Sequence, residues 1–157
     1  MKDPGLLLEN QICFRVYSLE KAILAAYKPL LDTLGITYPQ YLVLLVLWEH
    51  GPSTIGGICG LLGLDTGTVS PLIKRMESHG LLVRRRLPED ERTVQVVLSQ
   101  KGERLQEQAA NIPKEIGSCL FGSGSSFDTD AYIGLRTSLD RAIDSLRSSG
   151  CTIEEVK

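Results

Sequence analysis

The stretch LDTGTVSPLIKRMESHGLLVRRRLPEDERTVQVVLSQKG, residues 64–102, decides the fold of this chain. Its first part is typical of a short helix that Asp65 or Thr66 can cap and that Gly80 ends. The segments LLVRRR and TVQVVLS are typical of two short strands, and the polar turn LPEDE separates them. We therefore predict a helix followed directly by a charged β-hairpin over about residues 82–98.

A second short helix is predicted just before this one, in the segment TIGGICGLLG, with Ser53 as its cap. Interior glycines cost roughly 0.5–1 kcal/mol each relative to alanine, so this helix is expected to be loosely held. The brief, glycine-containing turn GLDTG joins the two helices, as in a helix-turn-helix. A charged hairpin directly after such a pair is the plan of a winged helix, which we expect over residues 53–98.

A long helix and a buried helix are predicted ahead of the winged unit. Apolar residues recur at helical spacing from Leu6 to about Leu31, and Gly35 ends that helix. Thr37 and Gln40 then match a capping box, in which each side chain bonds the backbone of the other residue. The helix that follows is apolar nearly all round, so it should be central and buried.

Two more helices are predicted after the hairpin. Ser99 can cap a helix over about residues 100–119, in which Pro113 would make a kink. Asp128 can cap a last helix that runs through Leu146.

The flanking helical segments, residues 6–34 and 99–149, have apolar stripes that so small a winged unit could not cover. They are therefore expected to pack against a second copy of the chain. The predicted fold class is α+β and mostly helical. It comprises a single domain over residues 1–157, in which a winged helix-turn-helix unit is flanked by N- and C-terminal helices that form a homodimer interface.

The sequence argues against several classes of protein. The four cysteines, at positions 13, 59, 119 and 151, form no CxxC and no repeated metal-ligand interval, so no metal or cofactor is predicted. No apolar run reaches the length of a membrane span. The N-terminal MKDPGLLLEN lacks the basic patch and longer apolar stretch of a signal peptide. A cytoplasmic location and no membrane partner are therefore expected.

Basic charge is concentrated in one region, although the net charge of the chain is −2. Residues 74–92 hold six basic and four acidic side chains, a net +2, whereas the remaining residues hold eleven basic and fifteen acidic ones, a net −4. Helix N-terminal amides, short hydroxyls and basic side chains suit phosphate and base-edge contacts, and arginine suits the narrow minor groove. A solvated hairpin without a partner is the alternative, but the tandem helices beside it favour double-stranded DNA. The predicted DNA-binding residues are Thr66, Thr68, Ser70, Lys74, Arg75, Arg84, Arg85, Arg86, Arg92 and Asp90, which would orient the Arg92 guanidinium.

The order of these elements, with RMESHGLLVRRRLPEDERTVQVVLSQKG, resembles the multiple-antibiotic-resistance regulator (MarR) family of dimeric winged-helix repressors. Within that family, ENQICFRVYS, YKPLLDTLGITYPQYLVLLVLWE and LDTGTVSPLIKRMESHGL are similar to the organic hydroperoxide resistance repressors (OhrR). The similarity covers residues 8–105 closely and the rest by helix order. It implies a homodimer on a pseudo-palindromic operator, released when an organic hydroperoxide oxidises the protein.

The resemblance also implies a redox-sensing cysteine at Cys13, whose thiolate is held by the hydroxyls of Tyr27 and Tyr38, with Tyr17 as a further candidate. Tyr17 lies one turn from Cys13 on the same face of the predicted helix. Tyr27 is fourteen residues away, about 21 Å along one helix, so it can meet only the Cys13 of a second, antiparallel copy. From the residues alone, Cys13 is also consistent with core filler and the tyrosines with interface packing.

A second thiol is needed if the oxidised cysteine is to form a disulfide. Attack of a thiolate on a peroxide gives a sulfenic acid, which condenses readily with another thiol. Some family members carry a second cysteine near the end of the helix after the wing, and by that resemblance Cys119 of the partner subunit is the candidate resolving thiol. The alternatives are a spare thiol at position 119 and Cys151 as the resolver, while Cys59 fits the apolar pattern of a core residue.

Two other functions are weighed against the peroxide-sensing repressor. One is a repressor of the same family that a small phenolic or lipophilic ligand releases from DNA. The other is a cysteine-based thiol peroxidase, which the lack of a CxxC and of a thioredoxin-like βαβ pattern argues against. The prediction is therefore a DNA-binding regulator rather than an enzyme.

Overall fold

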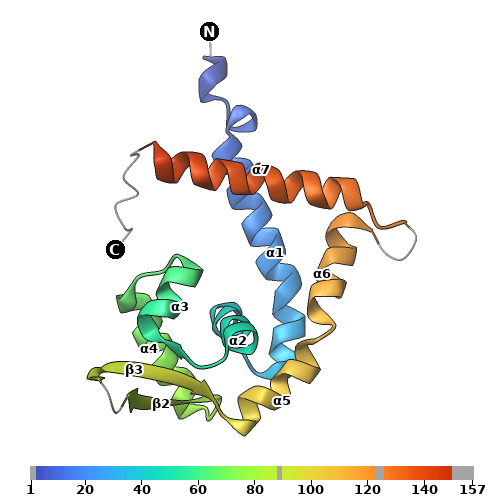
Figure 1. The fold of residues 1–157 in the computed structure, drawn as a ribbon. Helices are drawn as coiled ribbons and strands as arrows, with labels where there is room; N and C mark the ends of the chain where they lie inside the picture. The colour runs from blue at the N-terminus through green and yellow to red at the C-terminus, as the bar shows by residue number, and fades with distance from the viewer. Residues whose placement is uncertain (1–2, 88–89, 123–125, 150–157) are drawn as a thin grey trace. The chain divides into compact units, whose positions relative to one another are not determined.

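The computed structural model describes residues 3–87, 90–122 and 126–149, without the side chains of residues 87 and 90–92. The chain divides into two compact units, Met1–Ile112 and Pro113–Lys157. The first unit contains most of the helices and a three-stranded sheet (Figure 1). The predicted class, mostly helical with a small winged sheet, is confirmed. The second copy at the terminal helices stays a prediction.

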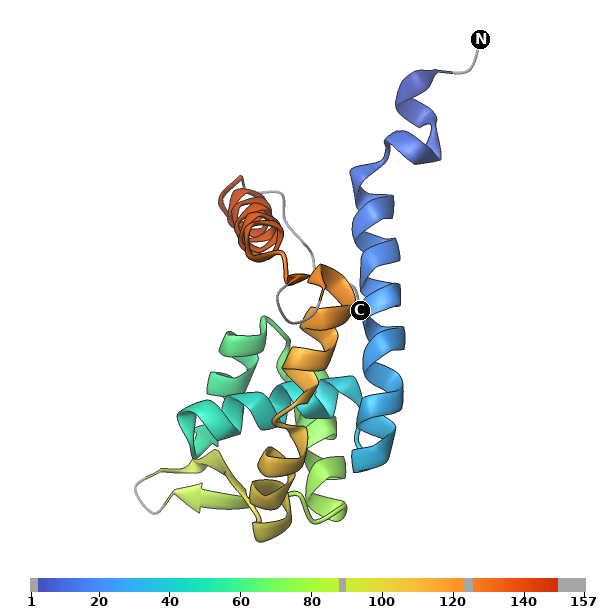
Figure 2. The ribbon, with the colours of Figure 1, turned by 90° about the vertical axis from the view of Figure 1, so that its right-hand side faces the viewer.

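The N-terminal segment begins with two short 3₁₀ turns, η1 (Pro4–Leu6) and η2 (Leu8–Asn10), before the long helix α1 (Ile12–Leu34). The prediction that the helix starts at Leu6 is therefore wrong. Local side-chain bonds favour the tight turns, because Asp3 accepts the Gly5 N–H at 2.8 Å and Gln11 donates to the Gly5 carbonyl. Figure 2 shows these turns and the start of α1 extending away from the rest of the first unit.

Helix α2 (Tyr38–His50) is the centre of the first unit. Its predicted capping box is present, with the Thr37 N–H donating to Gln40 Oε1 at 2.8 Å. Val43 and Leu44 are fully buried, as expected for a helix that is apolar nearly all round. The chain turns by 72° between α1 and α2, and α2 leads to the winged unit.

Helices α3 (Ile55–Leu62) and α4 (Thr66–Ser78) form the predicted helix-turn-helix, and the chain turns by 117° between them. Helix α4 is capped by Asp65, one of the two residues predicted for that position. The predicted Ser53 cap of α3 is wrong, because the Gly57 N–H donates to Thr54 at 3.0 Å. Ser53 instead lies in a two-residue strand, β1 (Ser53–Thr54).

The sheet is antiparallel with strand order β1-β3-β2. The hairpin of β2 (Leu82–Leu87) and β3 (Asp90–Leu98) is the predicted wing (Figure 1). Arg84 on β2 and Ser53 on β1 both pair with Val96, which is fully buried. Because β1 runs directly into α3, this pairing joins the sheet to the helix-turn-helix.

Helix α5 (Gln100–Ala109) follows the wing and is capped by Ser99, as predicted. It packs closely against α2 at Gly102, whose carbonyl oxygen accepts the Trp48 indole N–H at 3.1 Å. A side chain at position 102 would collide with the carbonyl oxygen of Leu81, so only glycine fits there.

The predicted single helix over residues 100–119, kinked at Pro113, is wrong, since α5 ends at Ala109 and a separate helix α6 (Ile112–Phe121) begins just before that proline. Pro113 explains the break, because it has no N–H to donate to the Ala109 carbonyl and suits the first turn of a new helix. The second unit contains the rest of α6 and the last helix, α7 (Thr129–Ser148), which Asp128 caps as predicted.

Apolar side chains remain exposed on the terminal helices of the single chain. On the N-terminal segment, Ile12 is 73% exposed and Val16 is 50% exposed, and α7 has no buried residue at all. In the described part of the chain, no single helix combines the length and apolarity of a membrane span, and the bent pairs α1–α2 and α3–α4 reach that standard only jointly.

Candidate functional site

Helix α4 has one buried face and one polar face. Val69, Leu72, Ile73 and Met76 are buried against the first unit. The predicted DNA-binding residues of this helix lie away from that core: Ser70 is partly exposed, and Thr66, Thr68, Lys74 and Arg75 are exposed. The helix therefore presents hydroxyls near its N-terminus and positive charge one turn later, all accessible to a ligand.

Asp65 holds the N-terminus of α4 in place. Its carboxylate accepts the Thr68 N–H at 2.8 Å and the Thr68 hydroxyl at 2.6 Å. These hydrogen bonds, led by the one from the Thr68 hydroxyl, hold the pKa of the Asp65 carboxyl below its ordinary value. The Thr68 hydroxyl is thus already oriented, with its oxygen still able to accept a hydrogen bond.

The wing arginines fall into two kinds. Arg85 and Arg86 are exposed, and neither forms an ion pair with a side chain that the structure describes. Arg84 is only partly exposed and is paired with Glu77 of α4. The side chains of Asp90 and Arg92 lie outside the described residues, so their predicted roles keep the support of the sequence alone.

Cys13 is exposed on the first turn of α1, which excludes burial in the core of the single chain. Its neighbours Ile12, Val16 and Tyr17 are exposed as well. The Tyr17 hydroxyl accepts a hydrogen bond from the Lys21 ammonium at 3.2 Å, and that ammonium also lies 5.1 Å from the ring centre. An accessible thiol therefore lies on an apolar surface, one turn from a tyrosine whose own proton remains free to donate.

Three tyrosine rings gather where α1 meets α2. The ring centres of Tyr27 and Tyr38 are 4.9 Å apart, and that of Tyr41 lies 5.8 Å from Tyr27 and 6.5 Å from Tyr38. Sequence reasoning found the first two and missed Tyr41. The signal was available in YPQY, because residues three apart lie on one face of a helix.

These phenols are protonated at neutral pH, and burial raises their pKa further above it. Desolvation, followed by the nearby Tyr38 and Tyr41 hydroxyls, raises the pKa of Tyr27 to about 12. Burial also raises the pKa of Tyr38 and that of Tyr41 above their ordinary value. At neutral pH each is a hydrogen-bond donor, and none of the three hydroxyls bonds another residue of the described chain.

The continuity of α1 separates Cys13 from this cluster within one chain. The helix runs unbroken from Ile12 to Leu34, so fourteen residues span about 21 Å between Cys13 and Tyr27. Within one chain, Tyr27 therefore lies beside Tyr38, and Cys13 lies one turn from Tyr17. These two pairs of predicted sensing residues are far apart from each other.

The other cysteines lie in different surroundings. Cys119 is exposed on α6 in the second unit, and Cys59 is partly exposed on α3, so it is less buried than predicted. Cys151 lies outside the described residues. No group of three or more histidine, cysteine, aspartate or glutamate side chains that could hold a metal is found among the residues with described positions.

Comparison with known proteins identifies the family. The MarR family model matches residues 36–94. The organic hydroperoxide resistance transcriptional regulator of Bacillus subtilis (strain 168) is 50% identical over 115 residues, which cover 73% of this chain and 78% of that protein. The chain belongs to the MarR family. This confirms the resemblance seen in the sequence and places the chain among regulators rather than enzymes.

Solved structures of the MarR regulator AbfR of Staphylococcus epidermidis agree with this assignment. Overoxidised AbfR bound to DNA is 33% identical with a TM-score of 0.72, covering 93% of this chain and 99% of that one. AbfR with a disulfide formed is 34% identical with a TM-score of 0.61, covering 89% of this chain and 90% of that one. The winged helix-turn-helix is thus that of known MarR regulators.

Proposed function

We propose that this MarR protein is a homodimeric, peroxide-sensing transcriptional repressor that leaves its operator when an organic hydroperoxide oxidises Cys13. The observation that carries the proposal is the exposed Cys13 at one end of α1, with a cluster of protonated tyrosines at the other end. Two antiparallel copies of α1 would place each thiol beside the partner's cluster. The similarity to a regulator named for organic hydroperoxide resistance supports the same chemistry.

The tyrosines would favour the reactive form of the thiol. A phenol O–H that donates to sulfur stabilises the thiolate, which is the species that attacks a peroxide. Tyr27, Tyr38 and the same-chain Tyr17 are the proposed donors, and the Tyr27 hydroxyl is protonated at neutral pH, so its proton is available for donation.

The oxidation step is a two-electron transfer. The Cys13 thiolate attacks the terminal oxygen of the hydroperoxide, the O–O bond breaks, and the alkoxide takes a proton and leaves as an alcohol. The sulfur becomes a sulfenic acid, which a second thiol can convert into a disulfide with loss of water. Cys119 of the partner subunit is the proposed second thiol, supported by its exposure on α6 and by the disulfide state of the related AbfR.

The DNA-binding part of the proposal rests on α4 and the wing. A dimer would place the two α4 helices in successive major grooves of a pseudo-palindromic operator, and each wing would reach the neighbouring minor groove. Thr66, Thr68 and Ser70 lie at the end of α4 suited to base edges and phosphates. Lys74, Arg75, Arg85 and Arg86 add exposed positive charge. Because its ligand is chromosomal DNA, we propose that the protein acts in the cytoplasm.

The test is operator binding by fluorescence anisotropy before and after stoichiometric organic hydroperoxide, with promoter DNA from beside the protein's own gene. Wild type and Cys59→Ser should bind when reduced, leave the DNA on oxidation and return with a thiol reductant. Cys13→Ser should bind and stay bound. If peroxide also releases Cys13→Ser from the DNA, Cys13 is not the switch.

Mass spectrometry of the oxidised protein tests the proposed disulfide. A Cys13–Cys119 crosslinked peptide is expected, and it should be absent from Cys119→Ser. A Cys13–Cys151 crosslink would assign the resolving role to Cys151. Excess peroxide should be run as a separate arm, because a DNA complex of the related AbfR exists in the overoxidised state.

A further inference from the structure

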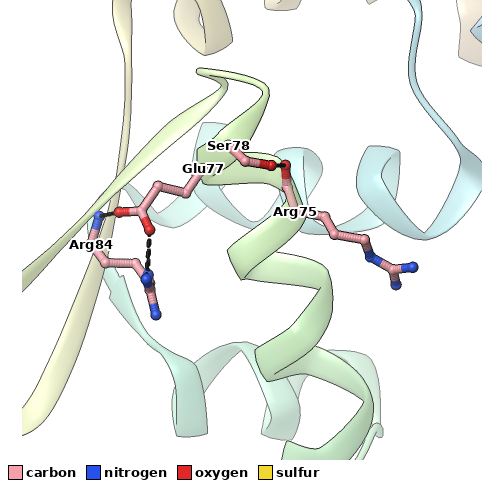
Figure 3. Close-up of polar contacts among 4 residues, drawn as sticks. All are labelled: Arg75, Glu77, Ser78 and Arg84. Carbon is pink, nitrogen blue, oxygen red and sulfur yellow. Dashed lines mark hydrogen bonds and ion pairs between the residues drawn. The ribbon is translucent and has the colours of Figure 1, made fainter.

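Glu77 and Arg84 join the end of α4 to the start of the wing. Arg84 Nε donates to Glu77 Oε2 at 2.7 Å, and Arg84 Nη2 lies 2.6 Å from the same oxygen. The backbone N–H of Arg84 donates to Glu77 Oε1 at 3.0 Å. Figure 3 shows the carboxylate lying between helix and strand, with both of its oxygens engaged by one residue.

This pair is more than a chance surface contact. Its two side chains are only 32–33% exposed, whereas a typical surface ion pair is held by one flexible contact in water. The Glu77 carboxylate accepts hydrogen bonds from both the backbone N–H and the guanidinium of Arg84, so it holds the strand as well as the side chain. The hydrogen bonds from Arg84, first from its backbone and then from its side chain, lower the pKa of the Glu77 carboxyl.

The other bonds at this corner hold the turn and the residue before the strand, where the Leu81 N–H donates to the Met76 carbonyl at 3.0 Å. Ser99 Oγ donates to the Gly80 carbonyl at 2.6 Å, and Lys101 Nζ donates to the His79 carbonyl at 3.0 Å. Among the side chains that the structure describes, Glu77 and Arg84 are the one ion pair between α4 and the wing. This contact therefore adds a side-chain link from α4 to β2 at Arg84, beyond the turn.

We propose that Arg84 is a positioning residue that orients the wing through Glu77, and that it does not bind a DNA phosphate. This inference rests on the DNA-binding function proposed above. A phosphate close enough to accept from Arg84 would also approach the Glu77 carboxylate, and the two anions would repel. The pair carries no net charge, in contrast to the exposed Arg75, whose guanidinium points away from it (Figure 3).

The exposed wing arginines depend on this orientation. Arg85 and Arg86 follow Arg84 directly on β2, and each step along a strand is about 3.3 Å. Arg84 pairs with Val96 of β3, so an error in its position is passed to the whole hairpin. Correct placement of the two exposed arginines against DNA is the function that the pair would serve.

The experiment compares operator affinity over a series of salt concentrations for reduced wild type, Arg84→Lys, Arg84→Gln, Glu77→Gln, the double variant with both glutamines, and Arg85→Gln. A positioning role predicts that the three single variants at the pair weaken binding by a similar factor, on the order of three- to tenfold. Lysine should not substitute for arginine, because it cannot make the paired contacts. The double variant should be no weaker than either single glutamine variant.

The salt dependence separates positioning from phosphate binding. Arg84→Gln should leave the slope of log affinity against log salt near that of wild type. Arg85→Gln is the matched control, and it should lower the slope by about 0.9 for each phosphate that the arginine neutralises in the wild-type complex. The proposal is overturned if Arg84→Gln lowers the slope in the same way while Arg84→Lys binds like wild type.

A DNA-free measurement keeps this inference distinct from the proposed function. In the reduced protein, the Arg84 Nε–H should give a nuclear magnetic resonance signal that exchanges slowly with water and disappears in Glu77→Gln. An Arg84 signal that exchanges as fast as that of Arg85 would overturn the inference. If the signal is slow but wild type binds no operator, the proposed function fails and the Glu77–Arg84 contact stands.

Discussion

Replacing Gly102 with alanine tests how α5 is attached to the winged unit. A Cβ at this position would collide with the carbonyl oxygen of Leu81 and would lie 3.1 Å from Leu98 Cδ2. The Leu81 oxygen is a backbone atom that already accepts the Ser99 N–H at 3.1 Å, so it cannot rotate away as a side chain could. Helix α5 would therefore have to move, and the hydrogen bond from Trp48 to the Gly102 carbonyl would be strained.

The expected loss of stability follows from these contacts. Overpacking a filled site costs about 1–3 kcal/mol, and a strained hydrogen bond adds about 0.5–1.5 kcal/mol. Alanine is better than glycine inside a helix by about 0.5–1 kcal/mol, which offsets part of the cost. The Gly102→Ala variant should thus unfold with a free energy about 2 kcal/mol below that of wild type.

The assay is chemical denaturation at one fixed protein concentration, followed by tryptophan fluorescence. Trp48 is the single tryptophan of the chain, so its emission reports directly on the bond to Gly102 and should shift to the red. The matched control is Gly56→Ala on α3, where a Cβ would meet nothing within 4 Å. The control should gain about 0.5–1 kcal/mol without a spectral change. A Gly102→Ala protein as stable as wild type, with unchanged emission, would refute the reasoning.

Three further predictions concern ionisable groups. Tyr27→Phe removes a proposed donor to the thiolate, so stopped-flow oxidation of Cys13 at neutral pH should slow by about tenfold, and an unchanged rate would remove Tyr27 from the site. Since the pKa of Tyr27 is raised from 10.0 to about 12 by folding, stability should be intact below pH 10 and fall as the pH rises toward 12, with a flatter profile in Tyr27→Phe. Folding lowers the pKa of the Glu77 carboxyl from its ordinary 4.5. The contribution of Glu77 to the free energy of unfolding should therefore be present at neutral pH and lost as the pH falls below about 4.5. Acid denaturation of Glu77→Gln should show a smaller loss over that range than wild type.

Local signals in the sequence were enough to place most helix starts. The capping box at Thr37 and the caps at Asp65, Ser99 and Asp128 each depend on residues within three positions, so the sequence pattern contains the whole contact. Ser53 failed as a cap because Thr54 next to it can make the same bond. The choice was decided by β1, which pairs with a strand more than forty residues away.

The candidate site was predictable to the extent that it depends on single elements. Cys13 and Tyr27 could be placed on one helix and shown to be too far apart within it. The contact of Tyr41 with that cluster, and the bond from Trp48 to Gly102, depend on how α1 and α5 pack on α2. Such contacts join residues from different elements. The spacing in YPQY places Tyr41 on the same face of α2 as Tyr38, but no periodicity within one element reveals which residues of another element meet that face.

Arg84 shows where counting charges along the sequence misleads. The count assigns residues 74–92 a net charge of +2 and treats every arginine there as available to DNA. Gly80, with φ of 70°, turns the chain back after α4, and this brings a strand arginine onto the Glu77 carboxylate seven positions earlier. The pair removes one positive and one negative charge from the exposed surface, so the net charge is unchanged while its distribution is sharpened. In the proposed DNA complex, electrostatic attraction would then be concentrated on Lys74, Arg75, Arg85 and Arg86, and Arg84 would govern where the last two of these lie.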